Sequence, residues 1–322
     1  STKSCVLWWV MKTEAEPPAG HGLVHSDAQG RGRNFWRAMP LQQRRRWLQG
    51  AFMALFLLAP SLNLFRFDLN ETQLWVLGMR WSLGIGAFQR GEASAMQTGW
   101  AILWRGFLPA LGLVAVFLGI AYKYGRVYCG WLCPHFSIVE TLNGLLHRAT
   151  GKLSLWDTSR TPHPTRTPNA RWWPVFLATC LGCGLVWAIT LLTYLLPPTE
   201  IWGNLYAGTL TANQTRFIGI GTLLFTLEFT LARHLFCRFG CAVGLFQSLA
   251  WMANPKGMVV AFARERAREC KTCDSPRGSA CDHACPMRLH PRNIKRMMFS
   301  CVQCGQCLDS CNETRSAQAL LP

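Results

Sequence analysis

Cysteine spacing is the feature of this sequence that points most directly to chemistry. The chain has 322 residues and 15 cysteines, and eight of these lie close together between residues 270 and 311. The last four follow the pattern Cys301-x2-Cys304-x2-Cys307-x3-Cys311. This spacing wraps an iron–sulfur cubane, because three thiolates come from one tight loop and the fourth cysteine reaches a second cluster. The pattern therefore predicts two [4Fe–4S] clusters, whose other ligands must come from a second set.

The second set lies directly upstream, as Cys270-x2-Cys273-x7-Cys281-x3-Cys285-Pro286, and repeats the pattern with a longer middle gap. We expect the two sets to exchange their fourth ligands. The first cluster would then take Cys270, Cys273, Cys281 and Cys311. The second would take Cys301, Cys304, Cys307 and Cys285. Cys-x2-Cys pairs also suit tetrahedral zinc, but zinc does not account for two x2…x3 repeats with a Cys-Pro at the end of the first.

Two further cysteine pairs, Cys129/Cys133 and Cys237/Cys241, each follow an apolar run and have i, i+4 spacing. On a helix this spacing puts both sulfurs of a pair on one face. The flanks are similar, since an aromatic residue precedes each first cysteine and basic residues lie just upstream. We expect the four thiols to converge in a third metal or redox site, for a further iron–sulfur cluster or for Cu(I). The simpler alternative is that small free cysteines pack at helix ends.

Apolar runs must position these thiols. Half of the chain is hydrophobic and only 15% is charged, with 15 Trp and 18 Phe, which is typical of membrane spans with interfacial Trp. A span needs about 20 apolar residues. Four runs approach this length, at residues 47–64, 101–122, 173–196 and 217–236. Leu74–Phe88 is too short to span, so we expect an interfacial or re-entrant segment there.

Basic residues orient the spans. Arg44–Arg46 precede the first run, and the loop Lys123–Arg171 is strongly basic. Because Lys and Arg accumulate on the cytoplasmic side, we expect both termini to be cytoplasmic. The predicted fold class is membrane all-α, a four-helix transmembrane bundle with a small C-terminal α+β domain of the two-cluster ferredoxin type. The predicted domains are a flexible cytoplasmic tail at 1–46, a transmembrane domain at 47–254, and the two-cluster domain at 255–322.

The net charge of +17 predicts contact with anionic lipid or acidic redox proteins. No nucleic-acid-binding motif is present, so we expect no nucleic-acid partner. Glu228 falls within the fourth run, where an acid is protonated, paired, or part of a proton or quinol site. Cys180 and Cys183 are expected to pack between helices, and His135 to be solvated or lipid-facing.

The two Cys-x3-Cys elements after membrane spans, followed by eight ferredoxin-type cysteines, resemble the membrane polyferredoxins of the NapH/NosR/CcoG group. Phe67-Asp68-Leu69 and Leu77-Gly78-Met79 look like the corresponding stretch of the CcoG (FixG/RdxA) branch. The sequence departs from the group where Ala242 replaces the proline expected after Cys241. The resemblance implies a bacterial inner-membrane protein that transfers electrons between a quinone or periplasmic-side partner and cytoplasmic partners. In the CcoG branch it implies Cu(II) reduction for oxidase assembly.

The sequence thus predicts a membrane-bound electron-transfer protein, an oxidoreductase component rather than a stand-alone enzyme, with partner proteins in a membrane complex and quinone as a candidate partner. The alternative is a CcoG-like Cu(II) reductase or metal-handling assembly factor, because soft thiolates suit Cu(I). A third reading is a redox sensor that holds clusters without carrying electrons onward.

Overall fold

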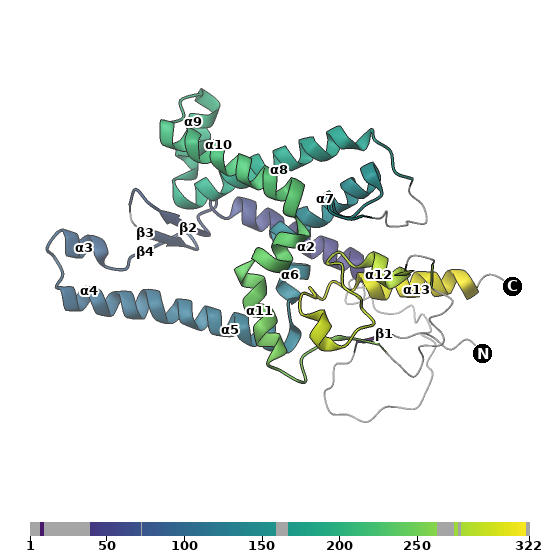
Figure 1. The fold of residues 1–322 in the computed structure, drawn as a ribbon. Coiled ribbons are helices and arrows are strands. Elements are labelled where there is room, and N and C mark those ends of the chain that lie inside the picture. Colours follow the sequence, from purple (N-terminus) through teal and green to yellow (C-terminus); the bar gives the residue numbers. More distant parts are fainter. Residues whose placement is uncertain are drawn as a thin grey trace, which may run out of the picture.

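The computed structural model describes residues 7–9, 39–71, 73–158, 167–262, 274–275 and 278–319, and it is mostly helical (Figure 1). Cys270 and Cys273 lie outside these residues. The long helices are α2 (Leu41–Leu58), α5 (Leu108–Tyr124), α7 (Pro134–Thr150), α8 (Trp172–Leu195) and α10 (Ala212–Leu227). The shorter helices are α3 (Ile85–Gln89), α4 (Ala95–Ile102), α6 (Val127–Trp131), α9 (Pro198–Ala207), α11 (Ala242–Met252), α12 (Ala280–Ala284) and α13 (Gln306–Ala319).

Among the described residues, three helical stretches are long and apolar enough to cross a membrane. They are Ala95–Tyr124, which joins α4 and α5 through the π-helix η1 (Leu103–Phe107), then α8, and Ala212–Ala232, which joins α10 to the π-helix η2 (Glu228–Ala232). Small residues let α8 and α10 approach closely. A Cβ on Gly184 would lie 2.7 Å from Thr226 Oγ1, and one on Gly221 would lie 3.1 Å from Ala188 Cβ. Close backbone approach at small residues is typical of helix pairs in membranes.

The first predicted span falls in α2, which is not among these three stretches. The helix begins at Leu41, inside the stretch predicted to be a flexible tail, and Arg45 and Gln49 on its first turns are buried. Its apolar part is short because six of its 18 residues are basic or amide side chains, all of them in the first half of the helix. Several of them contact the rest of the protein, and α2 begins beside the segment that carries the C-terminal cysteines (Figure 1).

The predicted interfacial segment, Leu74–Phe88, contains no long helix. It holds β3 (Gln73–Val76), β4 (Met79–Trp81) and most of α3, and its two strands form a three-stranded antiparallel sheet with β2 (Phe65–Asp68), which precedes the segment. Leu77 and Gly78, with φ of 51° and 77°, form the tight turn between β3 and β4. Two positive φ values in a two-residue turn match the right-handed twist of a hairpin.

The cysteine-bearing part of the chain is made of short elements. Besides α6, α11, α12 and α13 it contains the π-helix η3 (Phe236–Gly240) and the 3-10 helix η5 (Lys295–Met298). Two small antiparallel strand pairs complete it: β1 (Leu7–Trp9) with β5 (Val260–Phe262), and β6 (Asp274–Ser275) with β7 (Gly278–Ser279). Of these elements, α12 and α13 lie beside the first turns of α2, while α6 and α11 lie nearer the middle of the molecule (Figure 1).

Candidate metal centres

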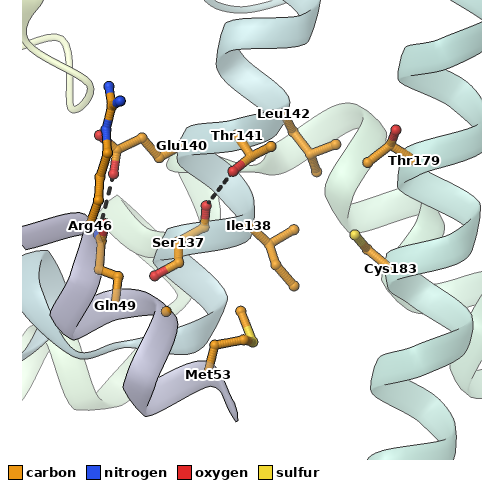
Figure 2. Close-up of a pocket in the computed structure, with 11 residues that line it drawn as sticks. Arg46, Gln49, Met53, Ser137, Ile138, Glu140, Thr141, Leu142, Thr179 and Cys183 are labelled. Carbon is orange, nitrogen blue, oxygen red and sulfur yellow. Dashed lines mark hydrogen bonds between the residues drawn. The ribbon is translucent and has the colours of Figure 1, made fainter. Parts of the chain in front are cut away.

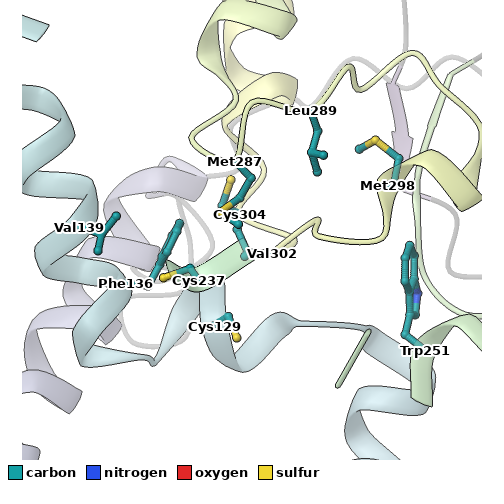
Figure 3. Close-up of a cluster of buried hydrophobic side chains, with 10 residues drawn as sticks. All are labelled: Cys129, Phe136, Val139, Cys237, Trp251, Met287, Leu289, Met298, Val302 and Cys304. Atoms are coloured by element: carbon teal, nitrogen blue, oxygen red, sulfur yellow. The ribbon is translucent and has the colours of Figure 1, made fainter. Parts of the chain in front are cut away.

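Four C-terminal thiols line one cavity, which we call the loop site: Cys285, Cys301, Cys304 and Cys307. Cys301 and Cys304 come from the loop that leads into α13, Cys307 lies in the first turn of α13, and Cys285 is the C-cap residue of α12. These are the four residues that ligand exchange predicts for the second cluster. The remaining wall is apolar, with residues such as Met287, Leu289, Met298 and Val302, several of which appear in Figure 3.

Local backbone geometry turns the loop around the cavity. Gln303 and Gly305 flank Cys304 and both have positive φ, 55° and 72°. The positive φ of Gly305 favours glycine, and a Cβ there would lie 2.7 Å from Leu41 Cδ2 on α2, so that the leucine side chain would have to move. Leu289 donates its backbone N–H to Cys285 Sγ at 3.4 Å, a contact that stabilises a sulfur in its charged form.

Only two of the four cysteines predicted to hold the first C-terminal cluster, Cys281 and Cys311, lie in the described residues. Cys281 on α12 and Cys311 on α13 are both buried, and α12 packs against α13, where Ser310 Oγ donates to the carbonyl of Ala280 at 3.2 Å. Ser279 Oγ lies 3.2 Å from Cys281 Sγ. The predicted partners of these two thiols lie outside the described residues. Of the first predicted ligand set, the described residues contain only Cys281 and Cys311, so this set stays a prediction.

The two Cys-x3-Cys pairs meet in a second group of thiols, which we call the rim site: Cys129, Cys133, Cys237 and Cys241. Each lies close enough to the others to act on them electrostatically. The first cysteine of each pair is buried, and the second is half-buried. The structure therefore brings together the four residues that the sequence predicts to converge (Figure 3 shows Cys129 and Cys237).

The predicted geometry within each pair is wrong in one respect, because neither pair lies along one continuous helix. Cys129 is in α6 and Cys133 is the N-cap residue of α7, while Cys237 is in η3 and Cys241 is the N-cap residue of α11. A break separates the members of each pair: Leu132 has φ of −121°, and Cys241 has extended φ and ψ of −80° and 108°. Both second cysteines thus begin a helix, with or without a following proline.

His135 contacts both the rim site and Glu228, a link that the sequence did not predict. His135 Nδ1 lies 3.6 Å from Cys237 Sγ, and His135 Nε2 lies 2.9 Å from Glu228 Oε2. The ring of His135 also packs against Phe229 and Phe236, each with ring centroids 5.3 Å apart. The expectation of a solvated or lipid-facing histidine is therefore wrong, and Glu228 is a paired acid at the end of its span. Nothing in the spacing of these residues indicates their contact.

Burial sets the electrostatics of both sites. It raises the pKa of the Cys301 and Cys304 thiols to about 12 each, and the pKa of Cys133 to about 11. It also raises the pKa of Cys237, an effect to which the neighbouring rim thiols add. These thiols are neutral in the protein alone, because a buried thiolate needs a nearby positive charge. A bound metal or cluster supplies that charge and displaces the protons.

The loop-site donor set fits an iron–sulfur cluster. Within the described ranges, no three His, Cys, Asp or Glu side chains converge closely enough to hold one metal ion. The loop-site thiols instead surround a cavity with apolar walls. An all-thiolate donor set around a water-poor space is the environment of iron–sulfur clusters in proteins.

A larger cavity of about 540 Å³ lies between α2, α7 and α8 (Figure 2). Its polar lining includes Gln49, Glu140 and Ser137, while Met53 and Ile138 are apolar. Cys183 reaches this cavity. Cys180 does not line it and packs against η2, where its Sγ donates to the carbonyl of Phe229 at 3.7 Å, as expected for a cysteine between helices.

Comparison with known proteins gives the same chemistry. A family model described as a 4Fe-4S binding domain matches residues 106–152, which contain Cys129 and Cys133. Protein RdxA of Cereibacter sphaeroides is 28% identical over 59% of this chain and 41% of its own length. The ferredoxin-type protein NapH of Escherichia coli is 24% identical over 65% of this chain and 68% of NapH, and that of Haemophilus influenzae is 23% identical over 64% and 66%. The chain thus spans less than half of RdxA. No solved structure matches.

These matches and the apolar helices define a membrane protein with a 4Fe–4S binding domain. More particularly, the chain is similar to the ferredoxin-type proteins NapH and to RdxA. The family match lies on the first Cys-x3-Cys pair, which sequence reasoning had left open between a cluster and copper.

Proposed function

We propose that this protein carries single electrons through three iron–sulfur clusters, two held by the C-terminal cysteines and one at the rim site. The observation that carries the proposal is the cavity at the loop site, where thiols from two separate sequence motifs line one apolar space. A bound [4Fe–4S] cluster supplies one-electron chemistry whose potential depends on hydrogen bonds, charge and solvent exposure. We propose Cys270, Cys273, Cys281 and Cys311 as the ligands of the remaining C-terminal cluster.

The chain's own residues provide the binding and the insulation. Cysteines at the ends of short helices offer sulfurs from two directions, and Met287, Leu289 and Met298 exclude water from the loop site. Exclusion of water lowers the local dielectric, so that nearby charges act strongly on whatever the thiols bind. Three of the rim thiols share one core cluster with three of the loop-site thiols: Cys129, Cys133 and Cys237 with Cys285, Cys301 and Cys304.

The membrane arrangement that we propose has both termini in the cytoplasm of a bacterium and the protein in the inner membrane. The basic loop between α5 and α8 supports this orientation. We propose that the apolar end of α2 forms a fourth span. Residues 255–322 are the proposed two-cluster domain. Anionic lipid at the basic face and redox proteins in a membrane complex are the proposed partners.

Quinone is a proposed partner because of the cavity between α2, α7 and α8. It combines apolar residues with hydrogen-bonding groups, which is the lining that a small amphiphilic ligand needs. Glu140 in its wall accepts a hydrogen bond from Gln306, which lies between Cys304 and Cys307. A ligand in this cavity would therefore lie beside the loop site. Glu228, paired with His135, is the proposed proton-handling group nearer to the rim site.

A copper-handling role remains the second candidate, because the four soft thiols of the rim site also suit Cu(I). The two functions differ in the iron, sulfide and copper that the protein should contain. We would purify the protein in detergent without oxygen, measure iron, sulfide and copper, and follow a redox titration by EPR. Iron and sulfide near twelve each, with three titrating signals, support the proposed function. Eight of each, with copper bound at the rim site, would replace it with the copper role.

A further inference from the structure

Arg126 is a buried cation placed between the rim site and the loop site. Its side chain is only 2% exposed, and its Nη2 donates to the carbonyl of Cys237 at 2.7 Å. The guanidinium acts electrostatically on the thiol of Cys129 in the rim site and on that of Cys301 in the loop site. Arg126 thus acts on a thiol of each site from one buried position.

The fold leaves room for this side chain. Gly244 on α11 faces the guanidinium, and a Cβ there would lie well inside 3.0 Å of Arg126 Nη2. Any other residue at position 244 would displace the arginine from the two sites. The Nε atom of Arg126 is buried and has no hydrogen-bond acceptor among the described residues. A buried charge with an unused donor is costly unless an anion lies nearby.

The anion that these surroundings would supply is a thiolate-bound cluster, which gains a further negative charge when it is reduced. We propose that Arg126 is the shared counter-cation of the rim site and the loop site, a positioning residue that makes reduction of both easier. The proposal rests on the proposed function, because it needs clusters at both sites. Charge near a cluster is one of the factors that set its potential, and a guanidinium in a low-dielectric core acts more strongly than one in water.

A purely structural arginine is the competing explanation, since the bond to the Cys237 carbonyl alone could hold η3 in place. The two explanations differ in what they predict for potential. A structural arginine affects how much cluster is bound, whereas a counter-cation affects the midpoint potential of the cluster that is bound. Stabilising the reduced, more negative state raises a midpoint potential, so removal of the cation lowers it.

The experiment compares the intact protein with Arg126→Gln, Arg126→Lys and the control Arg238→Gln, each purified in detergent with its clusters. Arg238 carries a charge one residue after Cys237 but contacts Phe239 instead of the thiols. Iron and sulfide are measured first, and each EPR signal is then titrated. We expect Arg126→Gln to reduce the reduction equilibrium constant of the rim signal at least tenfold, about 59 mV for a one-electron couple. The loop-site signal should shift in the same direction, and Arg126→Lys should restore most of both shifts.

An Arg126→Gln protein with full iron and unchanged potentials would overturn the proposal, as would an equal shift in Arg238→Gln. If Arg126→Gln does not retain iron, Arg126→Lys decides, because a retained charge must keep both potentials near those of the intact protein. A tenfold loss in that lysine variant would also count against Arg126 as a counter-cation. Absence of any rim signal in the unmodified protein would instead contradict the three-cluster function itself.

Discussion

Gly130, next to Cys129 of the rim site, packs against Val302 in the loop that carries Cys301 and Cys304 of the loop site. Its replacement by alanine is the sharpest test of the contact between the two sites. A Cβ at Gly130 would lie well inside 3.0 Å of the Val302 carbonyl oxygen and 3.1 Å from the Val302 carbonyl carbon. Both partners are backbone, so no side-chain rotation relieves the clash. The adjacent Trp131 Nε1 donates to the carbonyl of Gln303 at 2.9 Å, which holds the two segments together.

The expected cost follows from these contacts. Overpacking a tight contact costs about 1–3 kcal/mol, and alanine in a helix returns up to about 1 kcal/mol relative to glycine. We therefore expect Gly130→Ala to weaken the docking of the loop onto α6 by about 1–2 kcal/mol, which increases the undocked fraction roughly five- to thirtyfold. Gly144→Ala is the matched control, because Gly144 lies on α7 with nothing within 4 Å of its hypothetical Cβ.

The assay is iron release to a chelator in detergent at a fixed temperature, with hydrogen exchange of the peptides that cover residues 299–311 as a measurement independent of clusters. Gly130→Ala should release iron and exchange faster by that same factor, while Gly144→Ala should match the unmodified protein. If the two variants behave alike in both measurements, then the close approach of Gly130 to Val302 does not hold the sites together, and the reasoning fails.

Three further outcomes are expected. Cys285→Ser should remove the EPR signal of the loop site although Cys285 belongs to the other sequence motif, whereas Cys183→Ser should leave every signal in place. Because burial raises the pKa of Cys301 to about 12, Cd(II) binding to the cluster-free protein must release protons, so its affinity should fall as pH falls from about 8 to about 6. A pH-independent affinity in an absorbance titration would contradict this. Glu140→Gln should lower the thermal midpoint by leaving the buried Arg45 without its carboxylate, a loss of about 3 kcal/mol. An unchanged midpoint would mean that this pair does not hold α2.

The loop site could be predicted from sequence because its information is local. Three of its thiols lie within seven residues, and the positive-φ positions at Gln303 and Gly305 serve the same turn. The fourth, Cys285, follows from the ligand exchange that such spacing implies. Spacing also predicts the convergence of the rim thiols. It does not predict the backbone conformation within each pair, because i, i+4 spacing does not reveal that the helix is interrupted near Leu132.

The role of α2 could not be predicted in the same way. Arg44–Arg46 read as charges that orient a span, yet Arg45 is buried, pairs with Glu140, and donates to the carbonyl of Gly130 at 3.1 Å. Gln42 donates to the carbonyl of Cys304 at 3.0 Å. These bonds join residues that are far apart in the sequence, and the bonds to Gly130 and Cys304 end on backbone carbonyls, which carry no residue-specific signal. A basic run before an apolar run can therefore orient a membrane span or bind other parts of the protein, and only the fold distinguishes these two roles.

The contact between the two thiol sites also changes the meaning of the predicted boundary near residue 255. Composition changes there from apolar to polar, which is why a separate two-cluster domain is predicted. In the structure, however, Cys129 and Cys237 share one buried cluster with Met298, Val302 and Cys304 (Figure 3). A boundary in composition is thus not a boundary in packing. Since close-packed cores are not continuously deformable, this shared core would hold the proposed clusters at a fixed separation, and any change that loosens it should alter electron transfer between them without altering their ligands.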